Sequence, residues 1–113
     1  MKLTELIEPL SCKIIHEGSD FADTTIENVT ASDLMSDVLV VDKHNLLIVT
    51  SLASDQVIRT GDIVGARAVI VVNGKALPAT MSKLAQELDV SLLLSPLTKF
   101  MACVRIGRLM NTE

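Results

Sequence analysis

Apolar residues form three short, nearly continuous runs in the middle and C-terminal parts of the chain. The runs cover residues 45–50, 66–72 and 90–94, and mostly polar residues, glycine or proline flank them. A strand that is covered on both faces has this composition, because neither face needs polar side chains. We therefore predict three buried strands of a mainly parallel sheet.

Between and after these runs, apolar residues recur at helical spacing. A helix is predicted from Ser54 to a stop at Gly65, another over residues 80–88, and a last one over residues 97–110. Helices that alternate with strands return the chain to the same end of the sheet, which makes the strands parallel. The predicted fold class is α/β, a three-layer-like, mainly parallel sheet built from βα repeats.

The N-terminal third of the chain carries weaker patterns. Residues 4–10 predict a helix that a proline ends or kinks, and residues 13–16 predict a strand. Residues 21–29 predict an extended connection or an edge strand. Residues 32–39 have apolar positions at helical spacing after a serine that can cap a helix, so we expect a short helix there.

Length and hydropathy set the class of protein. The chain has 113 residues, which suits one domain, and its mean hydropathy is +0.44. A membrane span needs roughly 20 consecutive apolar residues, and the apolar runs are far shorter. The first residues contain acids and lack the pattern of a secretory signal. We therefore expect a soluble, cytoplasmic protein that does not contact a membrane.

Charge and side-chain chemistry argue against several partners. The formal net charge is −4 and the ten basic residues are scattered, which disfavours a nucleic-acid partner. Cys12 and Cys103 lie far apart, with no Cys or His at ligand spacing, so we interpret them as small buried thiols. We expect no bound cofactor and no metal site.

The ends of the predicted parallel strands are the first places to look for a ligand. Thr50 and Ser51 follow the first buried run, Asn73 follows the second and Ser95 follows the third. Ligands of open parallel sheets bind at the carboxyl ends of the strands, where hydroxyls and backbone N–H groups can hold an anion such as a phosphate. The alternative is that these residues only cap helices and form turns.

Asp33 and Asp37 are four residues apart in the predicted short helix. They would then share one helix face, where two carboxylates could bind a hard cation or act in acid–base chemistry. The alternative is that Asp33 interacts with the helix dipole while Asp37 is solvated. Glycine-rich phosphate loops are missing from the sequence, and Ser32, His16 and Cys103 lie in no nucleophile motif, so a hydrolase is disfavoured.

The last predicted helix has two kinds of face. Phe100, Met101, Val104 and Leu109 alternate with basic residues, including Arg105, which is typical of one buried face and one solvated face. A subunit contact is the alternative use of its apolar residues.

Four segments resemble the DRTGG domain family, and together the resemblance spans nearly the whole chain. They are residues 29–38, 48–50, 65–71 and 94–100. The resemblance is to a family similar to the N-terminal domain of HPr kinase/phosphorylase, also found between nucleotide-sensing CBS modules. It implies one regulatory α/β domain over residues 1–113 that dimerises, without the catalytic P-loop domain. The best-matched positions are Ser32, Asp33, Leu34, Ser36 and Asp37.

One departure from that family lies in its name-giving motif. The Thr-Gly-Gly of the family would align near Glu27, Asn28 and Val29, and both glycines are missing. If a close backbone approach there serves a ligand or partner, this chain has lost or altered it.

These observations support a leading hypothesis and two others. The leading hypothesis is a non-catalytic regulatory or ligand-sensing domain that works as a homodimer and binds a nucleotide or another small anion. The second is a protein-interaction accessory subunit of a larger enzyme or signalling assembly, without a small-molecule ligand. The third is an enzyme that uses Asp33 and Asp37. The candidate ligand-binding residues are Ser32, Asp33, Ser36, Asp37, Thr50, Ser51, Asn73 and Ser95.

Overall fold

A five-stranded, mostly parallel sheet forms the centre of the molecule. The computed structural model describes residues 1–110, and the strand order is β1-β5-β4-β3-β2. Strands β2 to β5 are parallel, while β1 pairs antiparallel with β5 at one edge. The strands are β1 (Lys13–His16), β2 (Asn28–Ala31), β3 (Leu46–Thr50), β4 (Ala68–Val71) and β5 (Ser91–Leu94). The predicted α/β class and mainly parallel sheet are confirmed.

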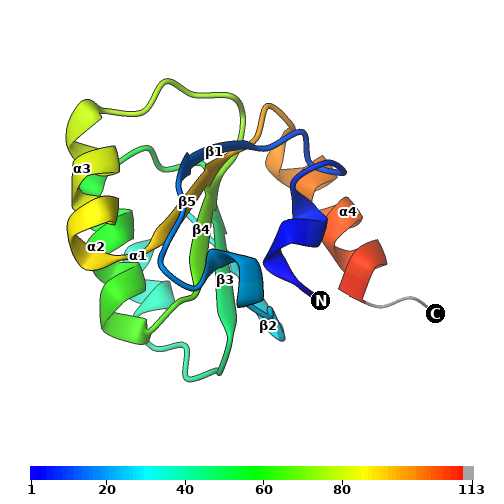
Figure 1. The fold of residues 1–113 in the computed structure, drawn as a ribbon, viewed down its shortest axis with the longest axis horizontal. Coiled ribbons are helices and arrows are strands. Elements are labelled where there is room, and N and C mark those ends of the chain that lie inside the picture. The colour runs from blue at the N-terminus through cyan, green and yellow to red at the C-terminus, as the bar shows by residue number, and fades with distance from the viewer. Residues whose placement is uncertain (111–113) are drawn as a thin grey trace.

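Helices cover both faces of the sheet and make a three-layer arrangement. Helices α1, α2 and α3 lie on one face, and η1 and α4 lie on the other (Figure 1). The short 3₁₀ segment η2 precedes β2. The helices are η1 (Leu3–Leu6), η2 (Phe21–Asp23), α1 (Met35–Val38), α2 (Asp55–Val64), α3 (Ala79–Leu88) and α4 (Lys99–Met110).

The two faces of the sheet form two separate hydrophobic cores. Successive residues of a strand point to opposite faces, so Leu47 and Val49 of β3 pack with η1 and α4. Leu46 and Ile48 pack with α1, α2 and α3. Every residue of β3 and β4 is buried, as the continuous apolar runs predict.

The sequence signals at the ends of α2 are confirmed. The Ser54 hydroxyl accepts a hydrogen bond from the backbone N–H of Gln56 at 3.2 Å, which caps the first turn. Gly65 ends the helix in the left-handed conformation, with φ of 71°, which a residue without a Cβ adopts at little cost. The N-termini of α2 and α3 lie at the edge of the sheet where the parallel strands end.

The N-terminal predictions need correction. Residues 4–10 do not form one helix, since η1 ends at Leu6 and turns follow it. The predicted helix over residues 32–39 shrinks to the single turn of α1, because Leu34 and Leu39 remain exposed and only Met35 and Val38 are buried. A one-turn helix has little stability of its own and depends on those two contacts.

The apolar residues of α4 also differ from the expectation. Phe100 is 74% exposed and Met101 is 36% exposed, whereas Ala102 and Ile106 are buried against the sheet. Phe100 and Ala102 are two residues apart in α4 and therefore lie on opposite sides of the helix. Cys12 and Cys103 are free thiols that are partly rather than fully buried, and burial raises the pKa of Cys12 to about 11.

None of the helices within residues 1–110 combines the length and the apolar character that a membrane span requires.

Candidate functional site

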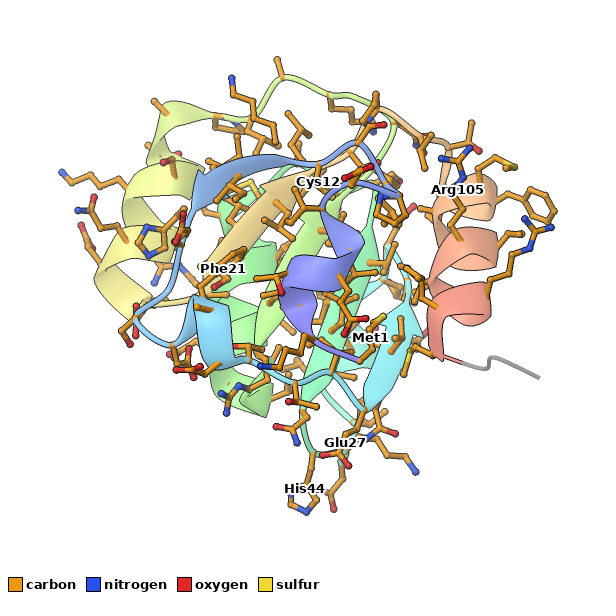
Figure 2. The ribbon with its side chains drawn as sticks, turned by 45° about the vertical axis from the view of Figure 1, so that its right-hand side comes forward. Met1, Cys12, Phe21, Glu27, His44 and Arg105 are labelled. Carbon is orange, nitrogen blue, oxygen red and sulfur yellow. The ribbon has the colours of Figure 1, made fainter. Side chains whose placement is uncertain are left out.

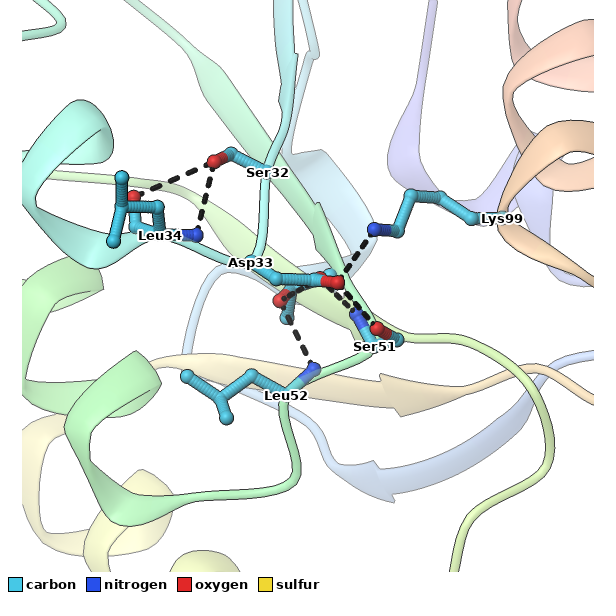
Figure 3. Close-up of polar contacts among 7 residues, drawn as sticks. Ser32, Asp33, Leu34, Ser51, Leu52 and Lys99 are labelled. Atoms are coloured by element: carbon cyan, nitrogen blue, oxygen red, sulfur yellow. Dashed lines mark hydrogen bonds and ion pairs between the residues drawn. The ribbon is translucent and has the colours of Figure 1, made fainter.

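Four hydrogen-bond donors converge on the carboxylate of Asp33 at the carboxyl edge of the sheet (Figure 3). Its Oδ1 accepts from the Thr50 hydroxyl at 2.9 Å and from the backbone N–H of Ser51 at 2.7 Å. Its Oδ2 accepts from the Ser51 hydroxyl and from the ammonium of Lys99, each at 2.6 Å. Thr50, Ser51 and Lys99 are called the Asp33 cradle below.

The parallel sheet positions the two hydroxyls of the cradle. Thr50 is the last residue of β3 and is fully buried, and its Oγ1 also accepts the N–H of Leu52 at 3.1 Å. Ser51 follows it directly, so its N–H and hydroxyl lie at the strand end. The backbone around Thr50 is therefore fixed by the sheet itself.

Asp33 reaches the cradle from the neighbouring strand. The N–H of Ser32 donates to the carbonyl of Val49 at 3.0 Å, which continues the pairing of β2 with β3 beyond Ala31. The Ser32 hydroxyl then accepts the N–H of Leu34 at 3.1 Å, which makes a tight turn that directs Asp33 toward the end of β3. Ser32 thus shapes the turn before α1 without contacting the cradle.

The cradle keeps Asp33 ionised. Partial burial disfavours the charge and would raise the pKa of Asp33, but the hydrogen bonds from Lys99, Ser51 and Thr50 outweigh it and hold that pKa far below its ordinary value. The ion pair with Lys99 is partly solvated, since the two side chains are 35% and 43% exposed. Asp33 is therefore a charged acceptor at physiological pH and does not act as a proton donor.

The structure separates the remaining predicted site residues from the cradle. Asp37 and Ser36 are exposed on α1, while Asp33 lies before that helix, so the two aspartates do not share a helix face. The buried Ser95 hydroxyl donates to the carbonyl of Leu10 at 2.7 Å, and the N–H of Asn73 donates to the carbonyl of Leu97 at 2.7 Å. Ser95 and Asn73 therefore hold loops together.

The geometry expected for a cation shared by Asp33 and Asp37 is not found, because Asp33 precedes α1 and Asp37 lies within it. Among residues 1–110, no group of three or more His, Cys, Asp or Glu side chains is arranged to hold a metal ion. Asp33 has an ammonium and hydroxyl donors around it, and an ammonium repels a cation.

Sequence reasoning missed Lys99. It is the first residue of α4 and lies 66 residues after Asp33 in the chain. Its position in the sequence could have identified it. Lys99 begins the helix that follows the last parallel strand, and such a helix starts at the carboxyl edge of the sheet.

The opposite, amino edge of the sheet carries an open hollow of about 530 Å³. Basic and acidic side chains alternate around it, and two of them are already engaged, since the Asn45 amide donates to Glu27 and Arg67 pairs with Asp20. Figure 2 shows Glu27 and His44 extending outward there. The lining residues are Glu27, Asp42, Lys43, His44, Asn45, Val64, Gly65 and Arg67.

A second hollow of about 560 Å³ lies between η1 and α4. Arg105 crosses this region and donates to the carbonyl of Pro9 at 2.7 Å, so its guanidinium ties the N-terminal segment to α4 (Figure 2). This contact gives Arg105 a structural role.

Comparison with known proteins identifies the fold. No protein-family model and no curated protein sequence matches the chain. A solved structure does match, with a TM-score of 0.76 and 13% sequence identity over 93% of this chain and 45% of the other. It contains the CBS and DRTGG domains of the regulatory region of Clostridium perfringens pyrophosphatase, complexed with the activator diadenosine tetraphosphate. The fold of this chain resembles part of that CBS and DRTGG domain region.

At this level of identity, the match to a CBS and DRTGG-type region establishes the fold alone. The chain spans less than half the length of the matched structure, as the 45% coverage states. The predicted resemblance to the DRTGG domain is thus confirmed as a likeness of fold.

Proposed function

We propose that this chain is a regulatory domain that senses a nucleotide or another small phosphate-bearing anion at the carboxyl edge of its sheet, and that it catalyses no reaction. The observation that carries the proposal is the convergence of the Thr50 and Ser51 hydroxyls, the Ser51 N–H and the Lys99 ammonium on one carboxylate. Such donors are the ones that hold phosphate oxygens in proteins.

The surroundings of the cradle favour an anion as well. The N-termini of α2 and α3 lie at the same edge, joined by a hydrogen bond of 3.0 Å from the Thr80 hydroxyl to the Asp55 carboxylate. Helix N-termini carry partial positive charge. The amino-edge hollow mixes carboxylates with basic groups, so it offers less to an anion.

The structural neighbour supports a regulatory role. That protein is the regulatory region of a pyrophosphatase bound to an activator that is a dinucleotide. We propose that this chain is likewise one DRTGG-like regulatory module over residues 1–113, located in the cytoplasm.

We also propose that the module acts as a homodimer. Leu34 precedes α1 and Leu39 and Val40 follow it, and the three are 58%, 48% and 80% exposed. Exposed apolar residues that cluster in this way are typical of a protein contact. A partner protein on the same surface is the second candidate function, that of an interaction subunit without a small-molecule ligand.

Thermal shift measurements on the full chain test the proposal. ADP, ATP, diadenosine tetraphosphate and inorganic phosphate are added to the wild type and to Lys99→Met. A ligand at 100 times its dissociation constant stabilises the folded state by about 2.7 kcal/mol, so the melting temperature of the wild type rises and that of Lys99→Met rises much less.

Two lysine variants serve as controls. Lys83→Met removes an exposed charge from α3 and keeps the full ligand response, while Lys43→Met alters the amino-edge hollow. A rise in melting temperature that is lost in Lys43→Met but kept in Lys99→Met would place the ligand at the amino edge of the sheet. That result would contradict the proposal. A wild type that responds to none of the four compounds favours the interaction subunit.

A further inference from the structure

We propose that Asp33 is an internal competitor: its carboxylate occupies an oxyanion site, and a phosphate group binds this domain by displacing it. The inference rests on the proposed function, because it specifies how that ligand is held and what its arrival changes.

The contacts of Asp33 are those of a bound oxyanion. Each of its two oxygens accepts two hydrogen bonds, at distances between 2.6 and 2.9 Å. One donor is a backbone N–H, two are hydroxyls and one is an ammonium, which is a donor set suited to a phosphate as well as to a carboxylate.

Two donors of the cradle, the Thr50 hydroxyl and the Ser51 N–H, are positioned by the sheet rather than by Asp33. Thr50 is fully buried at the end of β3, where it pairs with Val71 of β4. The N–H of Ser51 is fixed by the same backbone, and α4 places the backbone of Lys99 beside the cradle. Donors that are in place before the ligand arrives lose less entropy on binding.

The negative charge of Asp33 means that a phosphate must displace the carboxylate from the cradle, because the two anions would repel each other if both were bound there. The Asp33 carboxylate neutralises Lys99, the cation of the cradle. A phosphate placed beside an ionised Asp33 would meet a like charge within a few ångströms, which is repulsive. Once Asp33 leaves, the same donors and the free ammonium attract the incoming anion.

Asp33 lies in a segment through which its displacement can alter the exposed surface around α1. It lies between β2 and the one-turn α1, whose burial rests on Met35 and Val38. The exposed Leu34 is its direct neighbour, and Leu39 and Val40 follow α1. Release of Asp33 from the cradle therefore alters the apolar surface around α1, so that ligand binding and protein contact become linked.

Competition by an internal group lowers the apparent affinity by the fraction of molecules in which the site is open. Removal of the competitor should then tighten binding. We expect Asp33→Ala to bind inorganic phosphate about tenfold more tightly than the wild type, within the usual range of such coupling.

Equilibrium dialysis of the full chain with labelled inorganic phosphate measures this effect. Asp33→Asn is the second variant in case Asp33→Ala does not fold, and it should bind phosphate more tightly than the wild type, by a smaller factor because its amide still fills the cradle. Asp37→Ala is the matched control, since it also removes one exposed negative charge four residues away. The double variant Asp33→Ala/Lys99→Met should lose the gain.

Competition with ADP and with acetate identifies the source of the oxyanion. If ADP displaces phosphate from Asp33→Ala more effectively than acetate does, the site is assigned to the phosphate of a nucleotide. If phosphate binds more tightly than both ADP and acetate, the site is assigned to free phosphate. Acetate that binds most tightly overturns the assignment to a phosphate group.

The outcomes separate this inference from the proposed function. A folded Asp33→Ala or Asp33→Asn that binds phosphate no more tightly than the wild type overturns the displacement idea. The proposed function survives that result if nucleotides still raise the wild-type melting temperature and Lys99→Met abolishes the rise. Both are wrong if neither the wild type nor any variant binds phosphate or nucleotide at millimolar concentration.

Discussion

The ammonium of Lys99 and the carboxylate of Asp33 lie 2.6 Å apart, although 66 residues separate them in the chain. This ion pair joins the layer of α4 to the connection between β2 and α1, and so bridges the two faces of the sheet at its carboxyl edge. Its partial exposure means that the pair contributes little to stability, on the order of 1 kcal/mol or less.

The ionisation of Asp33 predicts a specific pH dependence. Because its pKa is lowered in the folded state, Asp33 contributes stability above its unfolded pKa of about 3.9, and this contribution disappears as pH falls toward the folded value. Asp33→Asn lacks the contribution. Urea denaturation should show the wild type to be more stable than Asp33→Asn at pH 6, by about 1 kcal/mol or less because the pair is half exposed, with the gap narrowing at pH 3.

The comparison cancels the effect of other acids. Asp89, whose pKa is lowered by hydrogen bonds from the Ser19 hydroxyl and N–H, titrates in both proteins. A gap between the wild type and Asp33→Asn that stays constant from pH 6 to pH 3 would contradict the prediction.

The N-cap of α2 can be tested directly. Ser54→Ala removes the hydroxyl that accepts the Gln56 N–H and should lower the free energy of unfolding by about 1 kcal/mol. Ser54→Asp keeps an acceptor at the same position and should retain most of that stability. A free energy of unfolding of Ser54→Ala equal to that of the wild type, measured by urea denaturation, would show that the cap is unimportant.

Two glycines should respond to alanine with opposite signs. Gly65 has a φ of 71° and an open space around an added Cβ, so backbone strain alone should destabilise Gly65→Ala by about 1 kcal/mol. Gly107 lies in α4 with similar open space, and Gly107→Ala should stabilise the protein by roughly 0.5–1 kcal/mol through helix propensity. Thermal unfolding of the two variants checks both signs.

Burial predicts which apolar residues hold the fold together. Ile70 in β4 is fully buried, so Ile70→Ala should cost roughly 2–5 kcal/mol. Phe100 is 74% exposed, and Phe100→Ala should change the stability of the monomer by less than about 0.5 kcal/mol. A large loss for Phe100→Ala that grows with protein concentration in urea denaturation would instead place Phe100 in a subunit contact.

Local signals predicted much of this fold. Continuous apolar runs identified β3, β4 and β5, because strands covered on both faces need no polar positions. Ser54 and Gly65 identified the ends of α2, because caps are local interactions between residues close in sequence. The carboxyl ends of these strands followed from the topology, and this placed Thr50 and Ser51 correctly.

Long-range packing decided what the sequence did not predict. Lys99 approaches Asp33 only because α4 returns across the sheet, and nothing near either residue encodes that contact. Phe100 looked like a core residue, but the small Ala102 faces the sheet in its place. Asp37 seemed to share a face with Asp33 because the helix was expected to begin at Ser32, whereas α1 begins at Met35.

The most direct test of the account is an NMR titration of the full chain with ADP and with inorganic phosphate, following every backbone amide. The account predicts the largest shifts at Ser51, Leu52 and Lys99, with smaller changes spreading into Asp33 and Leu34 as the carboxylate is displaced. Shifts confined to Lys43, His44 and Arg67 at the amino edge, or no shifts at millimolar ligand, would contradict it.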